Sequence, residues 1–348
     1  MNRLTHIHIG GFKSIREADL ELRPLNVLIG ANASGKSSFL SLFRLLQAAA
    51  AGAGALALRV GRAGGAESLL HYGPKTTAQV SVSLGYMLGA GALRWDKVLE
   101  HARGALVDVG PTNGVTIIAP CGAADVVFSH LRHAMAGWRL YHLDDTSETA
   151  ALRQQQNVDD NRDLKPDAAN LAPYLHLLRE TARPYYDRII RTVQLAFPEF
   201  DDFDVEPLEL NPHNVMLSWR EVGRDKLFGP HDLSDGTLRF MALATLLLQP
   251  EGRLPELILI DEPELGLHPA AIGLLGGMLR SVAEKTQLIV ATQSVRLVDE
   301  FEPEDIVVTE RVDGATKFRR LDPEPLAEWL EEYSVGELWE KNVIGGRP

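Results

Sequence analysis

Apolar residues along this chain form short blocks with the spacing of strands and helices. Residues 24–29 form an apolar, partly β-branched run, and residues 37–47 carry apolar side chains at helical spacing. A second apolar run, from residue 257, ends in acidic residues at 261 and 262, and a third spans 287–292. Buried parallel strands have this uninterrupted apolar form. The pattern predicts an α/β fold with a core sheet flanked by helices.

Other blocks alternate apolar and polar residues, which is typical of strands with one exposed face. Such strands are predicted at 4–9, 18–22 and 77–84, with weaker candidates near 104–109 and 114–119. Turn-forming residues between the last two favour an antiparallel β meander beside the core sheet.

Local composition changes twice along the chain. Residues 48–66 are rich in alanine and glycine and predict a helix end followed by a mobile loop. Residues 146–228 predict an inserted, mainly helical lobe, with one helix starting at Pro184. The flanking segments, 1–145 and 229–348, then form the N-terminal and C-terminal parts of the main domain.

Residues 30–37, Gly-Ala-Asn-Ala-Ser-Gly-Lys-Ser, match the phosphate-loop pattern G-x-x-x-x-G-K-[ST] at every fixed position. A strand before the loop and a helix after it provide the required context. Glycines let the backbone wrap around phosphate oxygens, and N–H groups at the helix start face the anion. A glycine-rich turn with a solvated lysine is the alternative. The residues predicted to bind nucleotide are Gly30, Asn32, Ser34, Gly35, Lys36, Ser37 and Ser38.

Side chains in and after the apolar runs suit nucleotide chemistry. Lys36 would bridge the β- and γ-phosphates, and the Ser37 hydroxyl would ligate Mg²⁺. Asp261 would hold the same Mg²⁺ through water, and Glu262 would orient and deprotonate an attacking water. Gln293 follows the strand at 287–292 and is placed to sense a γ-phosphate.

A further anion-binding candidate is Leu-Ser-Asp-Gly-Thr at 233–237, directly before an apolar helix at 238–248. A serine at a helix start followed by glycine presents backbone donors to an anion. Taken alone, Ser234-Asp235-Gly236 is also an ordinary capped turn.

Composition narrows the class of protein. The chain has 348 residues, is 45% hydrophobic and carries a net charge of −12, so any nucleic-acid contact needs a local basic patch or a partner. The single Cys121 excludes an internal disulfide framework and is expected to be a small packed residue. His6 and His8 share a strand face; a half-exposed face is favoured over a metal site. No run of 18 apolar residues occurs, which predicts a soluble, cytoplasmic protein without membrane contact.

The order of these motifs resembles that of ABC-type ATPases. The segments Gly-Phe-Lys-Ser-Ile at 11–15 and Asn-Val-Leu-Ile-Gly-Ala-Asn at 26–32 resemble the RecF, SMC and OLD-like branch of AAA-family ATPases. The resemblance is strong over residues 4–40 and 230–310. It implies a P-loop fold and a head-to-head homodimer with two ATP molecules sandwiched between the subunits.

The resemblance also implies roles for individual residues. Ser234 and Gly236 would reach the γ-phosphate bound by the opposite subunit, and Glu262 would be the catalytic base. Gln293 occupies a switch position where many relatives carry histidine, which implies slow hydrolysis because glutamine cannot exchange a proton near neutral pH. Asp235 replaces a glycine common in the signature and adds a negative side chain close to the nucleotide, which again implies slow or partner-dependent turnover. Lys13 would lie near the base or ribose, or cap a strand.

One motif of the family has two candidate positions in this sequence. The Q-loop position is either the segment 70–73 or Gln79.

The C-terminal part of the chain differs from that of OLD-type relatives. These relatives carry a C-terminal TOPRIM nuclease domain, whereas about 40 residues follow the last core strand here, too few for such a domain. A nuclease or other effector would therefore be a separate chain.

The expected function is an ATP-binding and ATP-hydrolysing dimeric switch in DNA- or RNA-linked processes such as repair or antiphage defence. Its partners would be a second copy, a separate effector and DNA or RNA. The alternatives are a slow ATP-binding scaffold and, less favoured, a transporter energy subunit.

Overall fold

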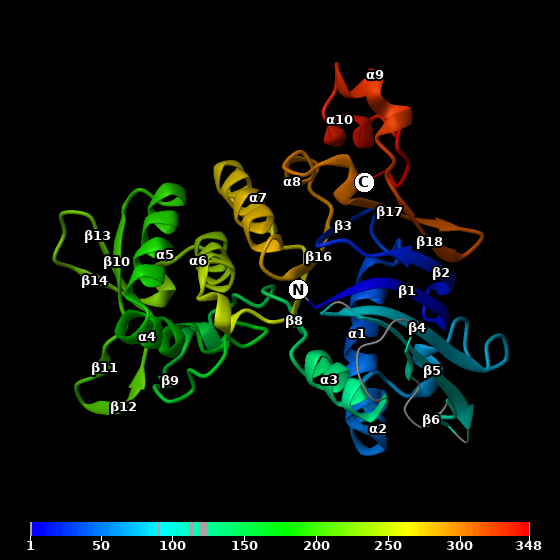
Figure 1. Cartoon of the computed structure of the whole chain (residues 1–348). Helices are drawn as coiled ribbons and strands as arrows, with labels where there is room; N and C mark the ends of the chain where they lie inside the picture. The colour runs from blue at the N-terminus through cyan, green and yellow to red at the C-terminus, as the bar shows by residue number, and fades with distance from the viewer. Residues whose placement is uncertain (1, 90, 103, 111–114, 118–123, 348) are drawn as a thin grey trace. The chain divides into compact units, whose positions relative to one another are not determined.

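The computed structural model describes residues 2–89, 91–102, 104–110, 115–117 and 124–347 (Figure 1). Cys121 and the turn expected at 111–114 lie outside the described residues. The chain divides into two compact units. We call residues 1–140, 255–261 and 286–348 the core unit, and residues 141–254 and 262–285 the lobe unit.

The sheet that carries the phosphate loop is mostly parallel. Strands β3 (Leu25–Ile29), β16 (Gln287–Thr292) and β15 (Leu257–Asp261) are parallel neighbours and are buried along nearly their whole length. The prediction of buried parallel strands is therefore confirmed. The full order is β18 (Ala315–Arg320), β17 (Ile306–Val312), β3, β16, β15 and β8 (Arg139–Tyr141).

The second large sheet of the core unit is antiparallel and contains the expected meander. Its order is β2 (Ile15–Glu21), β1 (Arg3–Phe12), β4 (Gln79–Leu88), β5 (Gly91–Ala102) and β6 (Ala105–Asp108), with β7 (Val115–Ile117) also paired to β5. Strand β5 was not expected, because Lys97 interrupts its apolar alternation. Lys97 is nevertheless buried, since its ammonium pairs with Asp108 and lies 5.6 Å from the ring centre of Trp95.

The prediction of a mobile loop within residues 48–66 is wrong, because most of this segment is helical. Helix α1 (Lys36–Ala51) continues past the predicted end at 47, and α2 (Ala53–Arg62) follows after Gly52. Alanine is the best helix former, and Leu56 and Val60, one turn apart, are both buried. Two apolar anchors are therefore enough to order this segment. Helix α3 (Ala124–Ala136) follows later in the chain and packs against α1.

The remaining helices of the core unit lie near the C-terminus. They are α8 (Val295–Val298), α9 (Ala327–Leu330) and α10 (Val335–Glu340). In the interior, Phe43 meets Trp138 edge-on with ring centres 5.5 Å apart, and Phe39 lies 5.1 Å from Phe318 of β18. These aromatic contacts fix α1, and with it the phosphate loop, against the core sheet.

The lobe unit combines helices with two small sheets. Its helices are α4 (Leu171–Thr181), α5 (Arg183–Ala196), α6 (Asp235–Leu248) and α7 (Pro269–Ala283), and Pro184 lies in the first turn of α5 as expected. The small sheets are β10 (Phe200–Asp204), β13 (Ser218–Glu221) and β14 (Leu227–Phe228), and β11 (Pro207–Leu208), β12 (Asn211–Val215) and β9 (Gln156–Asn157). Strands this short carry too few residues to show alternation, which explains why most were not expected.

Candidate nucleotide-binding site

Three chain segments meet at one edge of the core sheet. In the parallel register, Asp261 at the end of β15 lies opposite Ala291 of β16, and Thr292 of β16 lies opposite Ile29 of β3. Neighbouring strands are about 4.8 Å apart. The phosphate loop after β3, Gln293 after β16 and the Asp261 side chain therefore share the carboxyl edge, with Gln293 following the middle strand. Ligands of open α/β sheets bind at such an edge.

Lys36 lies across its own loop. Lys36 is almost completely buried, and its ammonium group donates hydrogen bonds to the carbonyl oxygens of Gly30, at 2.6 Å, and Ala31, at 3.1 Å. Helix α1 begins at Lys36, and the side chain of Ser37 just after it is exposed. A bound phosphate would therefore meet a positive helix end, first-turn N–H groups and a lysine charge already positioned by the loop.

The glycines of the loop are required by close neighbours. Gly35 has φ of 118°, and a Cβ there would lie 2.1 Å from Thr316 Oγ1. Gly30 has φ of 153°, and its Cβ would lie 2.1 Å from the Thr309 carbonyl oxygen. Thr316 Oγ1 also donates to the Ser34 carbonyl oxygen at 2.8 Å. Strands β17 and β18 thus support the loop from behind, a contact that no sequence motif indicates.

Polar groups of the loop fit a phosphate ligand. The Ser34 hydroxyl oxygen is buried and has no hydrogen-bond partner among the described residues. Asn32 is exposed, and Ser38 is half-buried in the first turn of α1. Buried polar atoms in native proteins usually have a partner, so the Ser34 hydroxyl leaves capacity for a ligand.

The donor set also fits Mg²⁺. The Ser37 hydroxyl and the Asp261 carboxylate are hard oxygen ligands, which magnesium prefers together with waters and phosphate oxygens. The Asp261 carboxylate also interacts with the charge of Arg44. Burial and the nearby charge of Arg59 lower the pKa of Arg44, whereas the Asp261 carboxylate raises it. Over the part of the chain that the structure describes, no cluster of three or more His, Cys, Asp or Glu side chains could hold a metal by itself.

Glu262 follows Asp261 directly and has an uncommon backbone conformation. Its φ is 47°, in the left-handed region that few non-glycine residues occupy. Such strain occurs at functional sites more often than elsewhere, and it orients the side chain differently from a continued strand. Glu262 therefore has a strained backbone directly after the candidate metal ligand Asp261, and its role as a base stays a prediction.

The Ser-Asp-Gly segment forms the start of α6 in the lobe unit. Ser234 Oγ accepts a hydrogen bond from the Thr237 N–H at 3.1 Å, so Ser234 is the N-cap, and its side chain is exposed. A Cβ at Gly236 would lie 2.1 Å from the Gly266 carbonyl oxygen. Ser234, Gly236 and His268 line a cavity of about 120 Å³. The capped turn is therefore packed tightly against the 264–268 turn of the same unit.

Lys13 lies in the turn between β1 and β2, with φ of 49°. Its ammonium donates to Ser41 Oγ at 2.9 Å, one turn along α1 from Ser37. Burial, and then the charges of Arg59 and Arg44, lower the pKa of Lys13. This places a cation beside the phosphate-loop helix and keeps Lys13 a candidate nucleotide contact.

The two Q-loop candidates lie in different surroundings. In the segment 70–73, the Tyr72 hydroxyl donates to the Gly314 carbonyl oxygen at 2.9 Å, and His71 Nδ1 lies 2.7 Å from the Lys13 carbonyl oxygen. Gln79 begins β4, and its side chain is exposed. The segment 70–73 thus contacts the residues beside α1, whereas Gln79 belongs to the meander.

The histidines of β1 have a carboxylate partner that the sequence did not reveal. Asp19 on β2 lies opposite His8, 2.5 Å from His6 Nε2 and 3.5 Å from His8 Nδ1. The hydrogen bond from His6 lowers the pKa of Asp19. All three side chains are partly exposed, so this is a polar strand face.

Two family models match the chain. Residues 127–299 match the model described as "AAA domain, putative AbiEii toxin, Type IV TA system", and residues 3–52 match an AAA ATPase domain. The second match contains the phosphate loop, and the first contains residues 261, 262 and 293. No curated protein sequence matches the chain.

Solved structures of SMC heads have the same fold. A Pyrococcus furiosus SMC head with an extended coiled coil, bound to the C-terminal domain of ScpA, is 13% identical with a TM-score of 0.65, covering 95% of this chain and 99% of that one. An SMC head bound to the C-winged helix domain of ScpA is 15% identical with a TM-score of 0.63 and coverage of 93% and 99%. The Thermotoga maritima head is 14% identical with a TM-score of 0.53 and coverage of 92% and 99%.

In the described part of the chain, none of the helices has the length and apolar character needed to span a bilayer. The phosphate loop, the core sheet and the two family matches agree with one another. Residues 3–52 and 127–299 therefore match AAA-family ATPase domains, and the chain has the fold of SMC heads, which are ABC-type P-loop ATPases.

Proposed function

We propose that the protein is a dimeric ATP switch that binds and hydrolyses ATP and gates a separate effector. The shared carboxyl edge of β3, β16 and β15 carries this proposal, because it aligns the phosphate loop, Gln293 and Asp261. The exposed, serine-capped start of α6 supplies a second set of anion donors in the lobe unit.

Each proposed role follows from the chemistry of the side chain. Lys36 and the first turn of α1 hold the triphosphate, while Ser37 and Asp261 hold Mg²⁺, which supplies charge neutralisation at the phosphates. Glu262 accepts a proton from the attacking water. Gln293 orients that water through its amide, without taking up a proton.

The second set of donors is proposed to act between copies. Ser234 and Gly236 of one subunit would bind the γ-phosphate held by the other, so that two nucleotides join two subunits. Hydrolysis would then separate the subunits. Since binding energy is gained only in the ATP state, the dimer would work as a switch.

A partner is proposed because the site alone does not define a substrate. The net charge of −12 opposes indiscriminate nucleic-acid binding, so DNA or RNA would act through a local patch or an effector. Two of the similar SMC heads were solved with domains of ScpA, which supports a separate protein partner here. Repair or antiphage defence is the proposed setting.

The mass of the protein in solution tests the dimer switch. Glu262→Gln should bind ATP and Mg²⁺, fail to hydrolyse, and elute as a stable dimer in light-scattering chromatography. Lys36→Ala should stay monomeric because the phosphate contact is lost. The wild type should dimerise transiently. Wild-type turnover in Glu262→Gln would show that the base has been assigned to the wrong residue.

Two other functions remain distinguishable from the switch. A scaffold would dimerise with ATP but show no turnover above background, with or without DNA or the co-purifying protein. A transporter energy subunit would co-purify with a membrane protein. Stimulated turnover together with a soluble partner supports the switch.

A further inference from the structure

Asp235 places a negative charge in the middle of the proposed anion-binding turn. Its side chain is 66% exposed and lies between Ser234 and Gly236. Triphosphates are strongly negative, so an uncompensated carboxylate at this position would repel the ligand that the turn is proposed to bind.

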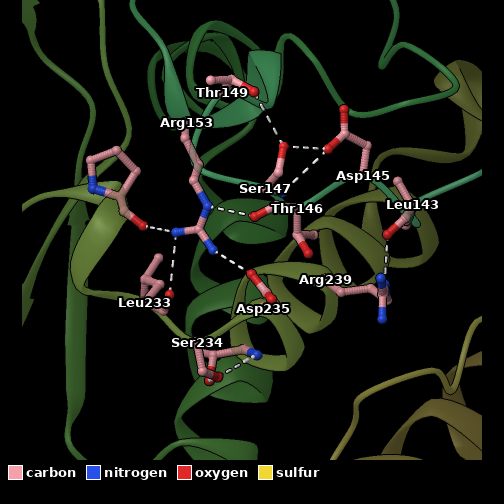
Figure 2. Close-up of polar contacts among 12 residues, drawn as sticks. Leu143, Asp145, Thr146, Ser147, Thr149, Arg153, Leu233, Ser234, Asp235 and Arg239 are labelled. Carbon is pink, nitrogen blue, oxygen red and sulfur yellow. Dashed lines mark hydrogen bonds and ion pairs between the residues drawn. The ribbon is translucent and has the colours of Figure 1, made fainter.

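The carboxylate is compensated from within the lobe unit. Arg153 Nη2 donates to Asp235 Oδ1 at 2.7 Å (Figure 2). Arg153 is only 5% exposed, whereas its partner reaches the surface. The positive guanidinium group therefore lies directly against the carboxylate that it compensates.

The guanidinium group is fixed by the backbone around it. Its Nε donates to the Thr146 carbonyl oxygen at 2.8 Å, and its Nη1 donates to the carbonyl oxygens of Leu233, at 3.2 Å, and Pro230. Four hydrogen bonds thus hold a planar fork in one orientation (Figure 2). Leu233 immediately precedes the turn and Pro230 lies four residues before Ser234, so the same arginine positions the backbone that leads into the turn and neutralises the side chain.

We propose that Arg153 is a positioning residue for the switch: it neutralises Asp235, so that the Ser-Asp-Gly turn of one copy can approach the triphosphate bound by another. This inference rests on the proposed dimer. It differs from the expectation that Asp235 slows turnover by adding charge near the nucleotide, because the charge is already paired. A sequence search for the turn alone would not find Arg153, which lies 82 positions away from Asp235.

Charge removal in pairs tests the inference. In the Glu262→Gln background, we compare Arg153→Gln, Asp235→Asn and the double variant by measuring the dimer dissociation constant with ATP and Mg²⁺ in sedimentation equilibrium. Arg153→Gln should weaken the dimer about tenfold or more. The double variant should return to within about threefold of the parent, because the repelling charge is gone. Asp235→Asn alone should dimerise no more weakly than the parent.

Three further tests separate the effect of charge from an effect on folding. ATP affinity of the monomers should be equal in all variants, since Lys36 and its loop lie in the core unit. The defect of Arg153→Gln should shrink as NaCl is raised, because salt screens repulsion. Arg153→Lys keeps the charge but not the planar fork, so it should dimerise more tightly than Arg153→Gln, and thermal melts of both variants check that they are folded.

The failures are distinguishable. If the double variant and Arg153→Lys are folded but as weak as Arg153→Gln, Arg153 only supports the backbone and the inference is wrong. If the Glu262→Gln parent itself stays monomeric with ATP, the proposed dimer is wrong, and the inference about Arg153 is then wrong as well.

Discussion

Thr316 Oγ1 occupies the space into which any side chain at position 35 would project. The hydroxyl lies 2.1 Å from the position of a Cβ on Gly35, and it donates to the carbonyl oxygen of the preceding residue, Ser34. The phosphate loop is therefore shaped by a hairpin strand nearly 300 residues later in the chain, and its conformation depends on that strand.

Gly35→Ala should abolish ATP binding. The added methyl group clashes with Thr316, and φ of 118° is strained for alanine. Isothermal titration with ATP and Mg²⁺ measures the loss. Gly61→Ala in α2 is the matched control, because a Cβ there meets nothing within 4 Å. Normal ATP affinity in folded Gly35→Ala would contradict the proposed nucleotide site.

Thr316→Val should lower the stability of the core unit and weaken ATP binding. Valine keeps the shape but leaves the buried Ser34 carbonyl without its donor, which costs about 1–3 kcal/mol. Thermal unfolding and ATP titration measure both effects. Thr316→Ser keeps the hydroxyl and should retain most of the affinity. Equal behaviour of the valine and serine variants would argue against a role for the hydroxyl.

Gly236→Ala should impair dimerisation without changing ATP affinity of the monomer. Its Cβ would lie 2.1 Å from the Gly266 carbonyl oxygen, so the start of α6 must shift. Gly277→Ala is the control within the same unit, since its Cβ meets nothing within 4 Å in α7. That control should gain about 0.4–1 kcal/mol in stability. Light scattering with ATP distinguishes the two variants.

Replacing Gln293 should alter turnover and its pH dependence. Gln293→Ala should lower turnover about tenfold, with ATP affinity nearly unchanged, because the water loses an orienting group. Gln293→His introduces a group with a pKa of about 6.5, so turnover should rise between pH 5.5 and 7.5 as the imidazole becomes neutral. Steady-state rates across this range provide the measurement. If the turnover of the wild type rose in the same way over this pH range, the view that residue 293 exchanges no proton would be contradicted.

Acid should remove the contribution of Asp19 to stability. The hydrogen bond from His6 lowers the pKa of Asp19 in the folded state. The stabilisation is therefore present above the unfolded pKa and is lost as pH falls through the folded pKa. Because Asp19 is largely exposed, the effect should be only about 0.2–1 kcal/mol. The free energies of unfolding of the wild type and of Asp19→Asn should differ at pH 6 and become equal in strong acid.

Local sequence patterns were sufficient to predict much of the core unit. Strands 25–29, 257–261 and 287–292 are short, mostly apolar runs, and such runs are stable only when both faces of a sheet are covered. The phosphate loop carries its own geometry in its glycines and lysine. For these reasons the α/β class and the phosphate-loop residues could be proposed from the sequence alone.

Weak local signals led to the errors. The segment 53–62 has many alanines and glycines, and only the burial of Leu56 and Val60 makes it a helix. Strand β5 was missed because Lys97 lies on its buried side, where Asp108 and Trp95 compensate the charge. Such compensation depends on residues that are remote from the strand.

The sequence by itself determined the nucleotide chemistry, since phosphate binding needs particular residues within a few positions of one another. The tertiary structure decided what surrounds that chemistry: Thr316 behind Gly35, Asp19 beside His6, and Arg153 beneath Asp235. The members of the pairs are 13 positions apart for His6 and Asp19, 82 for Arg153 and Asp235, and far more for Gly35 and Thr316. Their contacts exist only after the strands and helices have packed, because distance in space, and not along the chain, sets the strength of a clash or a charge pair.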